Sequence, residues 1–422
     1  MKRYLTSWFS DSSSWNLKQK LIYTIFVLLI YRVGVSIAVP FVDSSVFKQM
    51  MDSSEAGTLV MTAMTMTGAS LFQLGVFSLG VMPFITASIV FQVFKVIIPR
   101  LKEMYESPID LKRVTQWTRY ASVIFSGTTS IGILYGADKI FGIQVLTSKS
   151  PIAFIVAWFS LVVGALLVMR MGESITNKGV SNGTSLLIFT SILANMPNLV
   201  GQAWMHGRVW STIGFFLMVL AVLALVVYVE KSEYRVRVIY PKAAERQRVT
   251  SNFIPVKVAI AGVLPVIFVS SILSLPMLLD SVFKWGWAEW LNNHFAFDSP
   301  LYLITYVVLV FLFTFFAIEM VFSIDQITKQ VRMQGGIMPD KPKDKTVYQY
   351  LEYITESMGW LDAIYLSVIS LVTLILFPLV GLGSGAFGAT SIIILSTVVV
   401  TLLAAIDADK ASSLEGVRLL RR

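Results

Sequence analysis

Few residues of this 422-residue sequence have the types and spacing that catalysis or metal binding requires. The two histidines, His206 and His294, have no acidic or histidine neighbours at metal-ligand spacing. There is no cysteine, no His-Glu-x-x-His zinc motif and no Gly-x-Ser-x-Gly nucleophile elbow. The segment 381–388, GLGSGAFG, lacks the Gly-Lys-Ser/Thr ending of a phosphate loop. The sequence therefore predicts no enzyme activity, no cofactor and no metal.

Composition places the chain in a membrane. Hydrophobic residues make up 55% of it, charged residues 14%, and its mean hydropathy is +0.72; soluble domains carry about 25% charged residues. Apolar runs near the ~20 residues that cross a bilayer predict ten spans, at about 21–39, 76–98, 116–136, 152–169, 183–200, 210–229, 258–279, 302–322, 361–382 and 386–406. We therefore expect an all-α integral membrane protein with ten transmembrane helices.

Positive charges give the orientation of these spans. Of the 34 lysines and arginines, 27 fall on the side that holds both termini, 5 fall on the opposite side, and Arg32 and Lys95 lie inside spans. Short loops rich in Lys and Arg stay in the cytosol. The sequence thus predicts that both termini are cytosolic.

Ionisable residues deep in the spans are scarce. Arg32 is the clear case, whereas Glu173, Glu230 and Glu319 are expected near span ends that water reaches. Ion-coupled transporters depend on such groups within the membrane. A proton relay is therefore poorly supported.

The stretch 65–92, TMTGASLFQLGVFSLGVMPFITASIVFQ, is apolar but is interrupted by glycines and Pro83. Each glycine costs a helix about 1 kcal/mol and an interior proline about 3 kcal/mol. Irregular backbone at membrane depth is tolerated where protein buries it or water lines it. We expect a short re-entrant segment, a break near Gly75 and a span from about Val76 to Ile98. One helix with small residues at a packing interface is the alternative.

Two long basic segments lie on the cytosolic side. Residues 231–257 alternate charged residues with Val, Ile and Tyr, which predicts a β-hairpin. Residues 323–360 contain Gly335-Gly336 and two prolines, followed by a helical pattern at 347–357. Both segments are longer than a topology signal requires, so we expect them to dock an acidic or polyanionic partner. Their role as topology determinants alone is the simpler alternative.

Five stretches in order resemble the SecY family, the channel-forming subunit of the bacterial preprotein translocase. They are YRVGVSIAVP at 31–40, FSLGVMPFITASIVFQ at 77–92, MGESITNKGVSNGTSLLIF at 171–189, IPVKVAIAGVLPVIFVSSIL at 254–273 and QGGIMPDKPKDKTVYQYL at 334–351. The resemblance covers nearly the whole chain. It implies two inverted five-helix halves, 1–205 and 206–422, and a passive channel in the bacterial cell membrane that threads unfolded secretory proteins outward.

The resemblance also implies site residues. A plug at about 64–74 would close the channel on the outer side, with Met64, Gly68, Ala69, Ser70, Leu71, Phe72 and Leu74 in it. A ring at the waist would comprise Val81, Ile85, Thr184, Ile188, Ile267 and Ile394. An apolar constriction of this kind dewets and blocks ions. Membrane helices would leave through a lateral gate between the second or third span and the seventh or eighth. In the seventh span this chain has Ala259 in place of the family's usual asparagine.

The basic loops would bind the SecA motor ATPase or the ribosome, through Arg235, Lys242, Arg246, Arg248 and Lys341. SecE would stabilise the channel, SecG is an optional third subunit, and preproteins with signal sequences and membrane lipid would be the other partners. Lys341 stands where the family has an arginine, and lysine lacks the bidentate arginine fork. Such departures raise the possibility of an accessory member of the family.

Two other functions remain open from the residues alone. Secondary transporters of small solutes also use broken helices and inverted repeats. An insertase or scaffold without a pore is the third possibility. The long basic loops and the scarcity of buried charges favour the channel.

Overall fold

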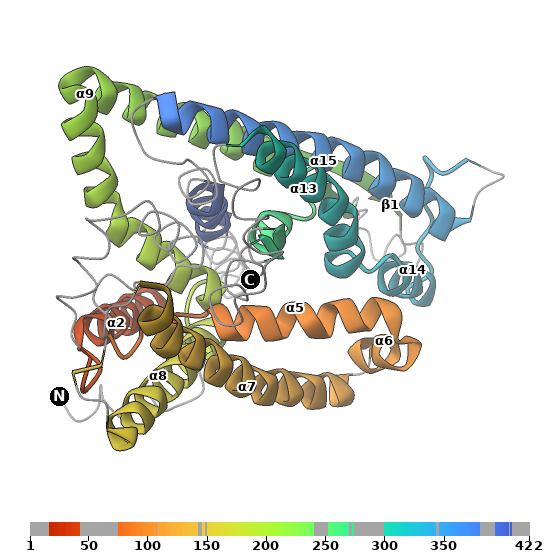
Figure 1. Ribbon diagram of the computed structural model, residues 1–422. Helices are drawn as coiled ribbons and strands as arrows, with labels where there is room; N and C mark the ends of the chain where they lie inside the picture. The colour runs from red at the N-terminus through yellow and green to blue at the C-terminus, as the bar shows by residue number, and fades with distance from the viewer. Residues whose placement is uncertain are drawn as a thin grey trace. The chain divides into compact units, whose positions relative to one another are not determined.

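The computed structural model describes residues 17–42, 75–106, 108–141, 146–147, 150–239, 252–269, 272–273, 299–342, 346–379, 393–404 and 406. These residues form a mostly helical protein with one two-stranded sheet among its described elements (Figure 1). In chain order the helices and strands are α2 (Leu17–Ser36), α5 (Met82–Ile97), α6 (Pro99–Glu106), α7 (Pro108–Phe141), α8 (Pro151–Lys178), α9 (Gly183–Lys231), β1 (Glu233–Val238), β2 (Asn252–Lys257), α13 (Pro300–Val321), α14 (Ile324–Met333) and α15 (Val347–Leu379). Shorter helices cover 264–269 and Ile393–Ala404.

Five described helices are long and apolar enough to cross a membrane: Leu17–Ser36, Pro151–Lys178, Thr212–Lys231, Pro300–Met333 and Val347–Leu376. A sixth is reached if Met82–Lys95 and Pro99–Tyr105, which meet at an angle of 113°, form one broken span. Gly183–Ala194 and Ile393–Ala404 are shorter apolar helices within expected spans. These helices indicate a multi-pass membrane protein. The expected number of ten transmembrane helices stays a prediction.

Local sequence explains where helices begin. Ser150 accepts a hydrogen bond from the backbone N–H of Ile152 at 3.3 Å and is followed by Pro151 at the first helical position of α8. Ser299 caps α13 in the same way, with the N–H of Tyr302 at 3.1 Å and Pro300 next in the chain. A proline at this position loses no intrahelical bond and has its φ preset for the helix.

The start of α5 differs from the expected span at 76–98. Residues 76–81 form successive turns, and the helix begins only at Met82. Gly80 has a φ of +56°, a conformation that ends regular right-handed helix at this point. Pro83 therefore lies in the first turn of α5, where it costs little. The break is longer than the sequence predicted.

The chain is divided into two compact units. Unit 1 comprises Met1–Ala87, Thr118–Pro197 and Val398–Arg422, and unit 2 comprises Ser88–Trp117 and Asn198–Thr397. These are groups of contacting residues rather than halves of the sequence. The division into residues 1–205 and 206–422 stays a prediction.

Hydroxyl groups join the helices of unit 1. The Tyr23 hydroxyl of α2 is hydrogen-bonded to Ser174 of α8, and the Tyr31 hydroxyl is 2.7 Å from Ser191 of α9. Arg119 of α7 is paired with Glu173 of α8 at 2.6 Å. A buried cluster brings together Leu134 of α7, three residues of α8 and two residues outside the helices: Ala157, Leu161 and Ala165, with Val39 and Leu79.

Unit 2 is built on the packing of α13 against α15, which lie side by side in Figure 1. Aromatic rings of α13 contact α15, with Phe311 and Phe315 both edge-on to Trp360 at 5.7 and 5.2 Å between ring centroids. The α15 helix is continuous from Val347 to Leu379. The helical pattern expected at 347–357 and the span expected at 361–382 are thus parts of one helix.

Candidate functional site

Four of the six expected pore-ring residues lie in unit 1. Val81 and Ile85 are 3% and 8% exposed, and Ile188 is 7% exposed. The N–H of Ile85 donates to the carbonyl of Val81 at 3.1 Å, so the first helical bond of α5 joins these two ring residues. Thr184 is half-buried at the start of α9, where its N–H donates to the Asn182 side chain at 3.0 Å.

The other two ring residues lie in unit 2. Ile267 is 8% exposed in the helix 264–269, and Ile394 is 2% exposed in Ile393–Ala404. Each of the six expected positions is therefore on or next to a helix; the five aliphatic side chains are at most 8% exposed, and Thr184 is half-buried. The assembly of all six around one pore remains a prediction.

Three glycines hold the turn that leads into α5. A side chain at Gly75 would overlap the Val35 carbonyl, one at Gly34 would overlap the Phe77 ring, and one at Gly164 would overlap the Val76 carbonyl. The N–H of Val76 donates to the carbonyl of Ile37 at 2.8 Å. We call residues 75–81 with their contacts on α2 and α8 the glycine clasp. It fixes the backbone immediately before Ile85.

Tyr31 connects the glycine clasp to a third helix. Its ring stacks on Phe77 with 6.3 Å between centroids and 8° between planes, and its hydroxyl meets Ser191. Tyr31 is 1% exposed. A buried tyrosine packs through its ring, and the hydrogen bond of its hydroxyl fixes the orientation of that ring. The clasp is thereby held from α2, α8 and α9.

The expected plug residues Met64, Gly68, Ala69, Ser70, Leu71, Phe72 and Leu74 lie outside the described residues. So do Lys242, Arg246 and Arg248 of the first basic loop. The first described residue after the expected plug is Gly75, in the glycine clasp.

The hairpin expected at 231–257 is confirmed. Strands β1 and β2 pair antiparallel, from Glu233 opposite Lys257 to Val238 opposite Asn252. Pro255 lies opposite Arg235 in the two-stranded ribbon, where an outer edge tolerates its missing N–H.

The second basic segment joins this hairpin. Ile239 and Ile337 exchange both backbone hydrogen bonds, each at 2.8 Å. We call β1, β2, Ile239, α14 and residues 334–342 the hairpin platform. The pairing joins two basic segments that the sequence predicts separately, because no local pattern indicates a pairing between residues so far apart in the chain.

An apolar core lies beneath the hairpin platform. Val236, Val238 and Val256 of the hairpin pack with Val331 of α14 and Met338, and all five are at most 3% exposed. The same cluster continues into α13 and α15 through Ala317, Ile318, Tyr350, Leu351 and Ile354. The platform is therefore anchored on two span-length helices rather than held by its two strands alone.

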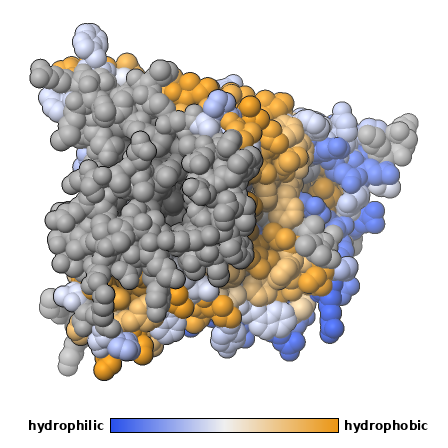
Figure 2. Space-filling view, in the orientation of Figure 1, coloured by the Kyte–Doolittle hydropathy of each residue, from blue (hydrophilic) through white to orange (hydrophobic). Residues whose placement is uncertain are grey.

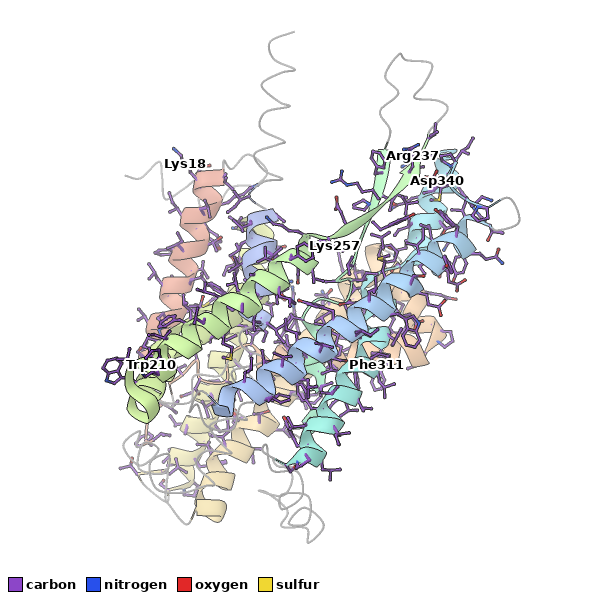
Figure 3. All side chains as sticks on the ribbon, turned by 90° about the horizontal axis from the view of Figure 1, so that it is seen from above. Lys18, Trp210, Arg237, Lys257, Phe311 and Asp340 are labelled. Carbon is purple, nitrogen blue, oxygen red and sulfur yellow. The ribbon has the colours of Figure 1, made fainter. Side chains whose placement is uncertain are left out.

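The surface of the platform is basic and partly apolar. Its described cations are Arg235, Arg237, Lys257, Lys329, Arg332 and Lys341, against the acids Glu233, Asp325 and Asp340. Met333 is 80% exposed and Ile337 58% exposed. Figure 2 shows hydrophilic surface gathered where Figure 1 labels β1 and α14, and hydrophobic surface over α13 and α15. In Figure 3, Arg237 and Asp340 lie at the same end of the hairpin, with Lys257 at its base.

The two described docking candidates differ in their surroundings. Arg235 is exposed and its Nε lies 2.7 Å from Glu233 Oε1. Lys341 donates from Nζ to the Pro342 carbonyl at 3.2 Å. An exposed ion pair such as that of Arg235 with Glu233 contributes about 0–1 kcal/mol.

The expectation for one ionisable residue of the spans is wrong. Arg32 lies within α2, where the sequence predicts a span, and its side chain is exposed on that helix. Glu230, expected to be reached by water, is 6% exposed, and Asp362 is fully buried in α15 at 0%. Asp362 was not predicted as a buried residue; a single acid at the start of an otherwise apolar run was the available signal.

Comparison with solved structures defines the class of fold. A structure described as that of a protein-conducting channel matches with a TM-score of 0.65 at 15% identity, covering 93% of this chain and 94% of that one. A structure of Sec61 in the canine ribosome–channel complex from the endoplasmic reticulum matches with a TM-score of 0.62 at 15% identity. The fold is that of the SecY and Sec61 channels.

Sequence comparison gives the family. The SecY family model matches residues 75–403. The protein translocase subunit SecY of Streptomyces griseus is 35% identical over 403 residues, which cover 90% of this chain and 92% of that protein. SecY of Escherichia coli strain K12 is 30% identical over 412 residues, 94% of this chain and 92% of that protein. The chain belongs to the SecY family.

Proposed function

We infer that this chain is the protein-conducting channel subunit of a Sec translocase. The observation that supports this most strongly is the match of residues 75–403 to the SecY family, on a fold shared with SecY and Sec61 channels. A channel subunit needs no chemistry of its own, in agreement with the sequence, which has none of the catalytic motifs sought. The small-solute transporter, the alternative from sequence, is not favoured by this membership.

The pore ring is the proposed seal. Val81, Ile85, Ile188, Ile267 and Ile394 supply aliphatic side chains, and Thr184 the one polar member. A narrow apolar constriction excludes water and ions, yet lets a chain of varied sequence slide because it binds none of it specifically. The burial of the five aliphatic members and the helical bond between Val81 and Ile85 support this role.

Residues 64–74 are the proposed plug, and the glycine clasp is its proposed fixed end. In the clasp, Gly75 forms a β-bridge with Ala38, which follows α2, and Val76 lies against α8. A plug attached to so fixed a point could leave the pore without displacing Val81 and Ile85. The lateral gate is proposed between the second or third span and the seventh or eighth, and apolar signal helices would pass through this gate into the lipid.

The hairpin platform is the proposed docking site for SecA or the ribosome. Its excess of cations suits an acidic or polyanionic partner, and its anchorage on α13 and α15 provides a path by which docking reaches the spans. SecE and SecG are the proposed subunit partners. A bacterial cell membrane location with both termini cytosolic is proposed from the distribution of lysine and arginine.

Reconstitution tests this function. The chain is placed with SecE in vesicles and supplied with SecA, ATP and a precursor that carries a signal sequence. Protection of the precursor from added protease, dependent on both ATP and the signal sequence, is the expected result. Saturable uptake of a small solute without precursor translocation would instead favour the transporter.

A further inference from the structure

Asp362 is a fully buried carboxylate in the middle of a span-length helix. Its Oδ2 accepts a hydrogen bond from the backbone N–H of Ala261 at 2.8 Å, and the carboxylate interacts to a lesser extent with the backbone N–H of Ile260. Glu230 is the other carboxylate below 9% exposure among the described residues, and it lies within electrostatic range. A buried charge is expensive, so a structural or functional reason for Asp362 is required.

The partner of Asp362 is a buried turn, residues 258–263, that leads from β2 into the helix 264–269. Ala259, Ile260 and Ala261 are at most 9% exposed. The turn is held at one end by the N–H of Val258, which donates to Ser232 at 3.0 Å. It is held at the other by Asp362. A buried N–H without an acceptor is destabilising because the donor has lost its hydrogen bonds to water, and the aspartate supplies that acceptor.

This turn determines where the next helix begins. Gly262 has a φ of +59°, and the N–H of Ile267 donates to the carbonyl of Val263 at 3.2 Å, which continues the turn into helix. The neighbouring Phe268 packs edge-on against Phe313 of α13 at 6.5 Å. Apolar ring packing tolerates small sliding movements, whereas a hydrogen bond to a fixed carboxylate has a direction and a length. The hydrogen bond between Ala261 and Asp362 therefore fixes the position of Ile267 along the axis of its helix.

We propose that Asp362 is a positioning residue that sets the depth of Ile267 in the channel constriction. This inference rests on the proposed function of Ile267 in the pore ring. Loss of the acceptor releases the turn, and the helix 264–269 then takes a range of depths and seals poorly. Leaving a buried N–H without its acceptor disfavours an arrangement by roughly five- to a hundredfold, so the loss of this hydrogen bond is large enough to be measured.

Two substitutions distinguish a role of Asp362 in positioning the helix 264–269 from a role in the overall stability of the protein. Asp362→Asn keeps an oxygen acceptor of the same shape and removes the repulsion from Glu230. Asp362→Leu keeps the volume but removes the acceptor. The natural chain has no cysteine, so spin labels can be introduced at Ile272→Cys, which follows the helix 264–269, and Leu312→Cys on α13, which are 36% and 57% exposed. A control pair of labels at Leu312→Cys and Ile364→Cys reports only the distance between α13 and α15.

The distances between the spin labels are measured by pulsed electron paramagnetic resonance on the assembled complex in vesicles. We expect Asp362→Leu to broaden the 272–312 distribution and leave the 312–364 distribution unchanged, and Asp362→Asn to leave both unchanged. Ion leak from the same vesicles should rise about tenfold in Asp362→Leu, within the range expected when a buried N–H loses its acceptor. An unchanged 272–312 distribution in Asp362→Leu, or equal broadening of both pairs, would overturn the proposal. The label distances need no transport, so a complex that translocates nothing would contradict the proposed function without affecting this result.

Discussion

Ile239 and Ile337 exchange two backbone hydrogen bonds of 2.8 Å and thereby join the two basic segments of the chain. Val238 and Met338, their neighbours, are 0% and 3% exposed in the core beneath. The hairpin therefore does not extend from the membrane as an independent ribbon. A partner that binds either segment acts on both, and through the shared core on α13 and α15.

Ile337→Pro tests this coupling. Proline removes the N–H that donates to Ile239, which should cost about 1–3 kcal/mol of local stability. We expect faster hydrogen exchange in both β1 and residues 334–342, together with weaker binding of SecA or ribosomes in sedimentation. Ile337→Ala is the matched control, since it keeps the N–H and removes the exposed side chain. Faster exchange limited to 334–342 would show that the segments are independent.

The hairpin was predictable and its third partner was not. Alternation of charged and apolar residues has the period of a strand and can be read over seven residues, from Glu233 to Ile239. The pairing of Ile239 with Ile337 depends on tertiary structure, since α13 and α14 must first fold between them. Asp362 was missed for a similar reason: its acceptor role depends on a backbone N–H in a turn distant along the chain.

The start of α5 shows the limit of hydropathy. Val76 and Phe77 are as apolar as the helix that follows, so the pattern predicted a span from Val76. The positive φ of Gly80 and the contacts of the clasp place these residues in turns. The sequence did predict that the glycines and Pro83 have a structural purpose at a break. Which glycine contacts which helix required the structure.

Ile85→Gly combined with Ile188→Gly tests the seal. Both side chains are buried in unit 1 on different helices, and their removal should let water enter the constriction. We expect a higher ion conductance of vesicles that hold the complex, with translocation retained. Each glycine also costs a helix about 1 kcal/mol.

The paired variant Ile85→Val and Ile188→Val is the control for this test, because it keeps branched aliphatic side chains at both positions. It should conduct as little as the natural chain. Equal conductance in the glycine and valine variants would remove these two residues from the seal.

Deletion of Met64–Leu74 tests the plug. The glycine clasp begins at Gly75 and makes its contacts with α2 and α8 without these residues. We expect a complex that assembles and unfolds at nearly the same temperature but leaks ions, or that is closed by a substitute segment and leaks intermittently in single-channel recordings. Failure to assemble would identify the stretch as core packing, the alternative that the sequence left open.

Gly164→Ala tests the glycine clasp, with Gly132→Ala as its matched control. Both glycines lie within helices, α8 and α7, and both belong to unit 1. A Cβ at Gly164 would overlap the Val76 carbonyl, whereas a Cβ at Gly132 would meet nothing within 4 Å. Overpacking costs about 1–3 kcal/mol, and replacing a free helical glycine gains up to about 1 kcal/mol. We therefore expect opposite shifts in the unfolding temperature of the purified complex, downward for Gly164→Ala and upward or unchanged for Gly132→Ala.

If the clasp holds the pore helix in place, Gly164→Ala should also leak ions, because Val81 and Ile85 come directly after the displaced turn in the chain. Stability lost without any leak would mean that the contact serves packing and does not position the pore helix.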